Sequence, residues 1–249
     1  MNPDQPCMYS KPKMVTTIEE LAFHKTRLGD LTLRRRPEPF LRNSDIFEVK
    51  LGDEFLMSSL FVEGERELAN LGLAGLGTDL SVVVGGLGLG YTAEAVLEHA
   101  NVSELIVIDI FPEVIRWHEE GLVPVGTRLA DDARCKMVSG DFFELARTGF
   151  ETADRTRKFD AVLLDIDHSP KHFLDDRNES FYGLEGLKLL RTQLKNDGIF
   201  ALWSTDLPDE TFLSTLESVF GIAEGHVVEF ANPYTKSTSF NSVYVARTK

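Results

Sequence analysis

The stretch that decides the fold is Leu80-Ser-Val-Val-Val-Gly-Gly-Leu-Gly-Leu-Gly-Tyr-Thr92. Its first half is an apolar run with three adjacent valines, which is typical of a strand buried inside a sheet. Four glycines are spread over the second half, and the residues from Thr92 to His99 have the composition of a helix. A strand, a glycine turn and a helix form the nucleotide-binding corner of a doubly wound α/β sheet, so we predict that fold class.

The glycine turn supplies the first predicted cofactor-binding residues: Gly85, Gly86, Gly88 and Gly90. A Cβ at such positions would hold the backbone away from a bound nucleotide. The start of the following helix also offers free N–H groups to a polar or anionic group. We therefore expect the ligand to lie over this turn.

A second apolar strand, Ser103 to Asp109, ends in a carboxylate about 20 residues beyond the glycines. Folds of this kind hold the ribose hydroxyls at that position, so we predict that Asp109 and the adjacent Ile110 bind the nucleoside. The competing interpretation is that Asp109 caps the helix that begins at Pro112.

A third strand ends in Gly140-Asp141, and both residues are predicted to contact the cofactor. The Asp141 carboxylate can accept a hydrogen bond from the amine of a base, or it can cap the helix predicted over residues 142–147. One carboxylate could serve both purposes.

The fourth strand, residues 159–165, places acidic side chains at its carboxyl end, which faces the ligand crevice in open α/β sheets. We predict that Asp165, Asp167 or His168 accepts a proton from the substrate, or that the two aspartates steer a cation. Asp165 is also expected to contact the cofactor. Tyr182 is predicted to orient the acceptor, although a tyrosine at a helix start more often only packs.

The same cluster has a metal-binding interpretation, because Asp165, Asp167, His168 and His172 are all capable ligands. Only Thr205-Asp206 offers further ligands after the fifth strand, and ligand types alone overpredict metal sites. We expect no metal. The charged, irregular residues 168–180 have the character of a mobile lid.

The chain divides into three parts: a polar leader (1–18), a small β-hairpin region with a linking helix (19–72) and the nucleotide-binding domain (73–249). Gly-Asp pairs at 29–30 and 52–53 predict the two hairpin turns, and helical spacing predicts a helix over 58–73. A helix is expected from 181 to about 195, stopped by Asn196-Asp-Gly198. Two strands without an intervening helix finish the chain as an antiparallel hairpin.

The net charge of the chain limits the kinds of molecule that it is expected to bind. The formal net charge of −14 disfavours nucleic acid, which needs a basic surface. Two cysteines cannot build a disulfide framework. The first 14 residues lack the apolar core of a signal peptide, and no apolar run approaches membrane-spanning length. We therefore expect a cytoplasmic protein without a membrane partner.

From about Leu21 onward the chain resembles the spermidine synthase (polyamine aminopropyltransferase) family. The resemblance rests on hairpins before the nucleotide domain, the glycine turn and the motifs Gly140-Asp141, Phe159-Asp-Ala-Val-Leu-Leu-Asp165, Glu179-Ser-Phe-Tyr182 and Pro233-Tyr-Thr-Lys-Ser. It implies the class I S-adenosylmethionine-dependent methyltransferase fold: a seven-stranded Rossmann-like sheet with an antiparallel C-terminal hairpin. It also implies that Asp109 holds the ribose, that Asp141 holds the adenine, that Asp165 faces the reacting centre and that the N-terminal hairpins help to form a homodimer.

The chain departs from the family in the half that handles the polyamine. The family usually carries an aspartate where this chain has Gly88; that carboxylate pairs with the amine of decarboxylated S-adenosylmethionine and repels the carboxylate of the ordinary cofactor. The family's His-Pro pair before the first strand, and the Tyr and Gln of its polyamine site, have no match here. Asp165 is followed by Ile-Asp167-His168-Ser-Pro170, which resembles the Asp-x-Asp-His of some small-molecule methyltransferases.

These departures lead us to expect methyl or aminocarboxypropyl transfer from S-adenosylmethionine to a small acceptor, an amine or a hydroxyl. One alternative is aminopropyl transfer from decarboxylated S-adenosylmethionine, as in spermidine synthase. A second is a nucleotide-binding protein without activity, and a third is an NAD-binding protein, which Gly140-Asp141 and the terminal hairpin disfavour.

Overall fold

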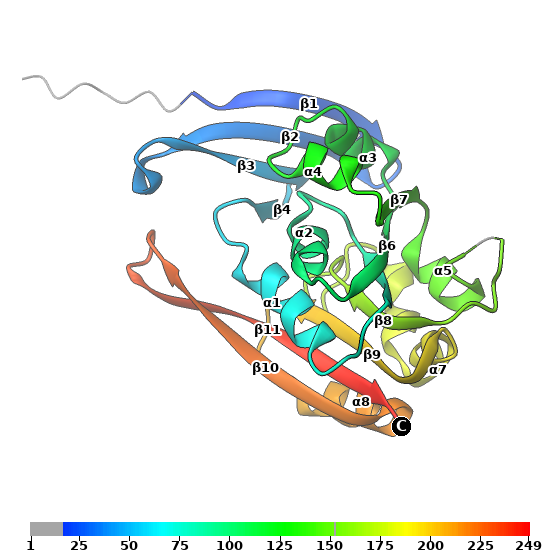
Figure 1. Ribbon diagram of the computed structural model, residues 1–249. Helices are drawn as coiled ribbons and strands as arrows, with labels where there is room; N and C mark the ends of the chain where they lie inside the picture. The colour runs from blue at the N-terminus through cyan, green and yellow to red at the C-terminus, as the bar shows by residue number, and fades with distance from the viewer. Residues whose placement is uncertain (1–16, 152) are drawn as a thin grey trace, which may run out of the picture.

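The computed structural model describes residues 17–151 and 153–249, so most of the predicted leader lies outside the described residues. An antiparallel four-stranded sheet in the order β1-β2-β3-β4 comes first (Figure 1). It is built from β1 (Glu19–Thr26), β2 (Gly29–Glu38), β3 (Ser44–Leu51) and β4 (Glu54–Ser58). The Gly52-Asp53 turn is as predicted, whereas the first hairpin turns two residues earlier, because Thr26 pairs with Gly29.

The second sheet has seven strands in the order β10-β11-β9-β8-β5-β6-β7. Its strands are β5 (Leu80–Gly85), β6 (Val102–Asp109), β7 (Cys135–Ser139), β8 (Phe159–Leu164), β9 (Leu194–Ser204), β10 (Gly221–Asn232) and β11 (Ser237–Thr248). The first five strands are parallel, and β10 and β11 add an antiparallel edge. This arrangement confirms the predicted doubly wound sheet with its C-terminal hairpin.

The connecting helices are α1 (Glu63–Leu73), α2 (Tyr91–Glu98), α3 (Pro112–Glu119), α4 (Gly126–Asp131), α5 (Phe142–Thr148), α6 (Glu179–Tyr182), α7 (Leu184–Arg191) and α8 (Glu210–Phe220), with 3-10 turns η1 (Pro39–Leu41) and η2 (Asp176–Asn178). None of the described helices is both long and apolar enough to cross a membrane.

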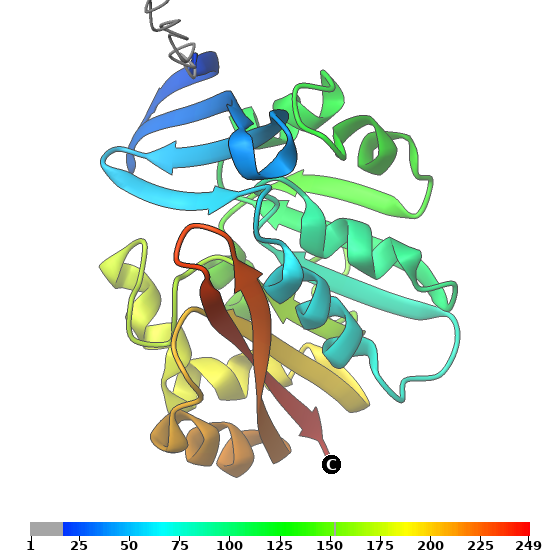
Figure 2. The ribbon, with the colours of Figure 1, turned by 90° about the vertical axis from the view of Figure 1, so that its left-hand side faces the viewer.

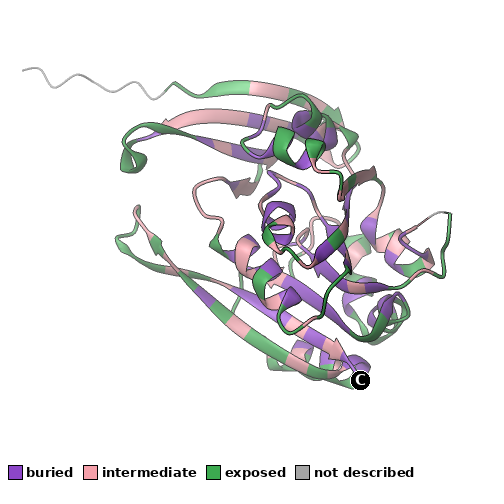
Figure 3. Ribbon diagram, viewed as in Figure 1, coloured by how far each residue is buried: buried purple, intermediate pink, exposed green. Residues whose placement is uncertain are grey.

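The central strands supply side chains to two apolar cores, one on each face of the sheet. Val82 and Val84 belong to the core formed with α1, α2, α3 and the N-terminal sheet, whereas Val83 belongs to the core formed with α5 to α8. Alternate side chains of a strand point to opposite faces, so an all-apolar strand is needed where both faces are covered. Figure 3 shows these central strands as largely buried.

The N-terminal sheet packs onto the nucleotide-binding domain at two places. Leu31 and Leu51 join the apolar core that contains Trp117 of α3. At the other place, the tip of the β10–β11 hairpin lies beside the N-terminal sheet (Figure 2). The Tyr234 hydroxyl near this tip hydrogen-bonds to Glu38 and lies 2.9 Å from a guanidinium nitrogen of Arg36. The small sheet is thereby held against both ends of the large one.

The single helix predicted from 181 to about 195 is wrong: it is interrupted near its start, and it ends four residues early. It breaks at Gly183, whose backbone is extended, and resumes as α7, which ends at Arg191. Leu194 already pairs with Phe159 of β8, and residues 195–198 are accommodated as an irregularity before Ile199 pairs with Ala161. The Asn196-Asp-Gly198 signal therefore marks a distortion inside β9, with Asp197 at a φ of 60°, and not the end of a helix.

Candidate active site

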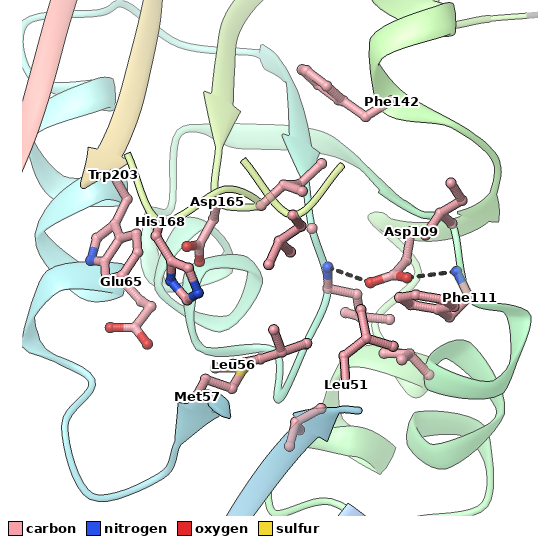
Figure 4. Close-up of a pocket in the computed structure, with 18 of the residues that line it drawn as sticks. Leu51, Leu56, Met57, Glu65, Asp109, Phe111, Phe142, Asp165, His168 and Trp203 are labelled. Atoms are coloured by element: carbon pink, nitrogen blue, oxygen red, sulfur yellow. Dashed lines mark hydrogen bonds between the residues drawn. The ribbon is translucent and has the colours of Figure 1, made fainter. Parts of the chain in front are cut away.

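A cavity of about 370 Å³ opens at the carboxyl ends of β5 and β8, beneath the N-terminal sheet. The chain leaves β5 toward β6 on one side, and β8 lies on the other, which makes this the topological switch point where open α/β sheets bind ligands. Much of its wall is apolar and comes from both sheets and from the segments that follow the strands, including Leu51, Leu56, Met57, Phe111, Phe142 and Trp203 (Figure 4).

Two glycines of the turn line the cavity, and neither position has room for a side chain. Gly86 has a φ of 93°, and a Cβ there would clash with the carbonyl oxygen of Asp165. Gly88 has a φ of 48°, and its Cβ would lie 2.5 Å from the sulfur of Met57. Backbone in the left-handed region favours glycine, so the turn keeps its shape and its open floor only with glycine here.

The other predicted glycines lie beneath the site and do not line the cavity. A Cβ at Gly85 would lie 2.5 Å from the Phe142 ring, one at Gly90 would lie 2.6 Å from His118, and one at Gly140 would meet Leu145 at 3.1 Å. These glycines let the helices pack closely against the strand ends. A direct contact with a ligand stays a prediction for them.

Asp109 organises the turn from the end of β6. Its carboxylate accepts hydrogen bonds from the backbone N–H groups of Leu87, at 3.0 Å, and Phe111, at 2.8 Å. Burial raises the pKa of this carboxyl, although the hydrogen bonds oppose the shift. Asp109 and Ile110 both line the cavity, so the residue that shapes the turn also presents a carboxylate to a ligand.

Asp141 caps α5, with Oδ1 accepting from the N–H groups of Phe143, at 3.0 Å, and Glu144, at 3.3 Å. The capping interpretation is therefore correct. Asp141 also lines the cavity, and its second carboxylate oxygen receives no hydrogen bond from the described residues. The cap leaves room for the predicted second role, contact with a base.

Asp165 and Glu65 are two carboxylates in the same part of the cavity. Asp165 follows β8 and accepts a 2.6 Å hydrogen bond from Thr92 Oγ1 of α2. Burial raises its pKa to about 6. Glu65, on α1, is 6% exposed, and burial together with the charge of Asp165 raises its pKa to about 8. Two like charges in a poorly hydrated space disfavour each other, so the pair holds a proton near neutral pH.

Asp167 and Tyr182 do not line the cavity. The Asp167 carboxylate is fully buried and accepts hydrogen bonds from Leu174 N, at 2.7 Å, from Asn178 Nδ2, at 3.0 Å, and from the Tyr182 hydroxyl, at 2.7 Å. The geometry makes Asp167 the anchor of the loop that follows β8. The structure thus separates these two predicted catalytic residues from Asp165.

His168 lines the cavity, and its Nε2 lies 2.9 Å from a carboxylate oxygen of Glu54 in β4. His172 points elsewhere and lies 3.6 Å from Asp206. Within residues 17–151 and 153–249, no three His, Cys, Asp or Glu side chains converge as a metal site would require. The four residues considered as metal ligands, Asp165, Asp167, His168 and His172, therefore contact different partners.

Sequence reasoning missed three residues of the site: Glu65, Met57 and Trp203. The available signal was the position of Glu65, which lies three residues before the buried Leu68 and so shares the inward face of α1. Burying a carboxylate on an apolar helix face costs free energy, so such a residue indicates a functional role. Met57 and Trp203 reach the cavity only through the contact between the two sheets.

Comparison with known proteins identifies the family. The family profile described as the spermine/spermidine synthase domain matches residues 66–220. The chain belongs to the spermine/spermidine synthase family. It is 31% identical over 118 residues to polyamine aminopropyltransferase 1 of Hyperthermus butylicus and 29% identical over 150 residues to polyamine aminopropyltransferase 2 of Pseudomonas aeruginosa. These matches cover 47% and 56% of this chain, but 38% and 39% of the relatives.

The fold agrees with this assignment. A spermidine synthase crystallised with the transition-state analogue AdoDATO superimposes with a TM-score of 0.72 over 92% of this chain and 74% of that protein, at 17% identity. The family resemblance predicted from the motifs is therefore confirmed.

The preference for methyl or aminocarboxypropyl transfer is wrong, because the curated relatives are polyamine aminopropyltransferases. That prediction rested on the missing carboxylate at Gly88. The absence of an acid at position 88 does not leave the cavity without one, because Glu65 of α1 brings a carboxylate into the same cavity.

Proposed function

We propose that this chain transfers an aminopropyl group from decarboxylated S-adenosylmethionine to a small amine. The acceptor nitrogen attacks the carbon next to the sulfonium. A C–N bond forms as the C–S bond breaks, sulfur leaves as a neutral thioether, and the nitrogen releases a proton. The sulfonium is already a good leaving group, so the protein has to align the reactants and exclude water.

The observation that carries the proposal is the charge of the cavity. Glu65 supplies a buried carboxylate and Asp165 a half-buried one. Among the described residues that line the cavity, the one permanent cation is Arg177, which forms an ion pair with Asp175. A donor with a carboxylate would add a further negative charge beside this acidic pair, whereas a donor with only an ammonium brings a positive charge that both carboxyl groups favour.

Five of the residues that line the cavity are expected to hold the donor or the reacting nitrogen. Gly86, Gly88 and Asp109 receive the ribose, and Asp141 receives the adenine amine. Asp165 faces the reacting nitrogen and accepts its proton, a task for which a carboxyl with a raised pKa is suited. The apolar walls exclude water from the sulfonium.

The test is a transfer assay with isotopically labelled decarboxylated S-adenosylmethionine and a panel of diamines and monoamines, read by mass spectrometry of the products. We expect an acceptor heavier by one aminopropyl group, together with methylthioadenosine. Transfer of a methyl group from S-adenosylmethionine, or no product with any amine, would contradict the proposal.

We further propose that two copies of the chain associate through the N-terminal sheet. Phe23 of β1 is 45% exposed, and Ile18, which directly precedes β1, is 53% exposed, so this edge of the small sheet offers apolar side chains to a second copy. Light scattering after size-exclusion chromatography should give twice the chain mass, and Phe23→Ser should shift the population toward the monomer. A wild-type protein that runs as a monomer at micromolar concentration would contradict this assembly.

A further inference from the structure

Glu65 is a buried carboxylate without a partner. No other described residue donates a hydrogen bond to its side chain, although it is 6% exposed and lines the cavity. The neighbouring cation on α1, Arg66, is directed away, toward Glu94 and Glu98. A lone buried carboxylate is costly, and such a cost is typically retained where a ligand supplies the missing partner.

The cavity has two chemically different ends. Figure 4 shows Asp109 and Phe111 on one side, Glu65 and Trp203 on the other, and Asp165 between them. The backbone N–H of Asp165 donates a 2.8 Å hydrogen bond to the carbonyl oxygen of Gly85, so Asp165 lies beside the glycine turn. A nucleoside whose ribose is near Asp109 therefore extends its sulfur substituent past Asp165 and toward Glu65.

The acids available along this path are few. The acidic residues that line the cavity are Glu65, Asp109, Asp141, Asp165 and Asp175. Asp109 is at the nucleoside end, Asp141 caps α5, and Asp175 is paired with Arg177. The turn cannot contribute another, because Met57 occupies the space beside Gly88. Glu65 is thus the carboxylate beyond Asp165 that has no other partner.

We propose that Glu65 binds the terminal ammonium of the donor's aminopropyl arm and thereby selects the decarboxylated donor. This inference rests on the function proposed above. The ammonium forms a charge-assisted hydrogen bond with Glu65 in a space that excludes water, where such bonds are strong. Asp165 is then left to face the acceptor nitrogen, so each of the two amines has its own carboxylate.

The experiment is calorimetric titration of the full chain with decarboxylated S-adenosylmethionine and with 5′-methylthioadenosine, which has the same nucleoside but no ammonium. In Glu65→Gln we expect the affinity for the decarboxylated donor to fall at least tenfold, while the affinity for methylthioadenosine stays within twofold of wild type. Glu67→Gln is the matched control, since it makes the same change on the same helix outside this cavity.

Equal losses for both ligands, or no loss for either, would overturn the role of Glu65. Glu65→Met, which keeps roughly the volume of the side chain, is an apolar replacement beside the polar Glu65→Gln and must show the same ligand dependence. The proposed function fails separately, if the wild-type chain transfers nothing from the decarboxylated donor. A wild type that transfers aminopropyl groups, together with a Glu65→Gln variant that keeps the wild-type donor preference, would reject this inference alone.

Discussion

At the scale of single residues, the pair Glu65 and Asp165 should make the stability of the ligand-free protein depend on pH. Their folded-state pKa values, about 8 and about 6, lie above those of an unfolded chain. The folded state therefore binds more protons, and the free energy of unfolding should decrease as the pH rises from about 5 to about 8.

The test of that pH dependence is thermal unfolding of wild type and Glu65→Gln across this range. The other titratable groups that face Glu65 are Glu63 of α1 and Tyr91 of α2, which stay unchanged in the variant. We expect Glu65→Gln to have the higher Tm at pH 8, by about 5 °C, and the difference to shrink toward pH 5. Parallel curves for the two proteins would show that Glu65 is ionised in both states.

A second prediction at the scale of single residues concerns Gly88. Gly88→Asp, which restores the family's usual residue, should destabilise the protein by about 1–3 kcal/mol. Its backbone is left-handed and its Cβ would press on the Met57 sulfur. Adding Met57→Ala should recover part of the loss, giving a coupling above about 0.5 kcal/mol in a chemical-denaturation cycle. Additive effects would mean that Met57 does not restrict position 88.

At the scale of elements, the loop after β8 is held by the contact between Asp167 and Tyr182. Tyr182→Phe removes the 2.7 Å hydrogen bond and leaves the buried Asp167 Oδ2 with only the 3.1 Å hydrogen bond from Asn178 Nδ2, which should cost about 1–3 kcal/mol. Hydrogen exchange should accelerate in residues 168–178, and KM should rise more than kcat falls. A large fall in kcat with unchanged exchange would instead return Tyr182 to the catalytic group.

The sequence predicted elements better than it predicted the contacts between them. The glycine turn, Asp109 and Asp165 were found because they follow apolar strands, and strand ends of a parallel sheet converge. Glu65 was missed because its role depends on which side of α1 faces the sheet. The early start of β9 depends on the pairing of Leu194 with Phe159, which a local pattern does not contain.

At the scale of the whole molecule, Tyr234 links the end of the large sheet to the small one. Tyr234→Phe removes its hydrogen bonds to Arg36 and to the fully buried Glu38. We expect a loss of about 1–2 kcal/mol in chemical denaturation and weaker donor binding, because the Met57 wall loses support. Unchanged donor affinity would show that the wall is held by the Leu31 and Leu51 contacts alone.

The wall that Met57 forms against Gly88 has a consequence for how the site is assembled over time. Met57 and Trp203 line the same cavity but lie 146 positions apart in the chain, and contacts between segments so distant in sequence are slow to form. A polypeptide that is still being synthesised can contain the glycine turn before the residues that complete the cavity wall have been added. We therefore expect the chain to bind the nucleotide only after β9, which carries Trp203, has joined the sheet.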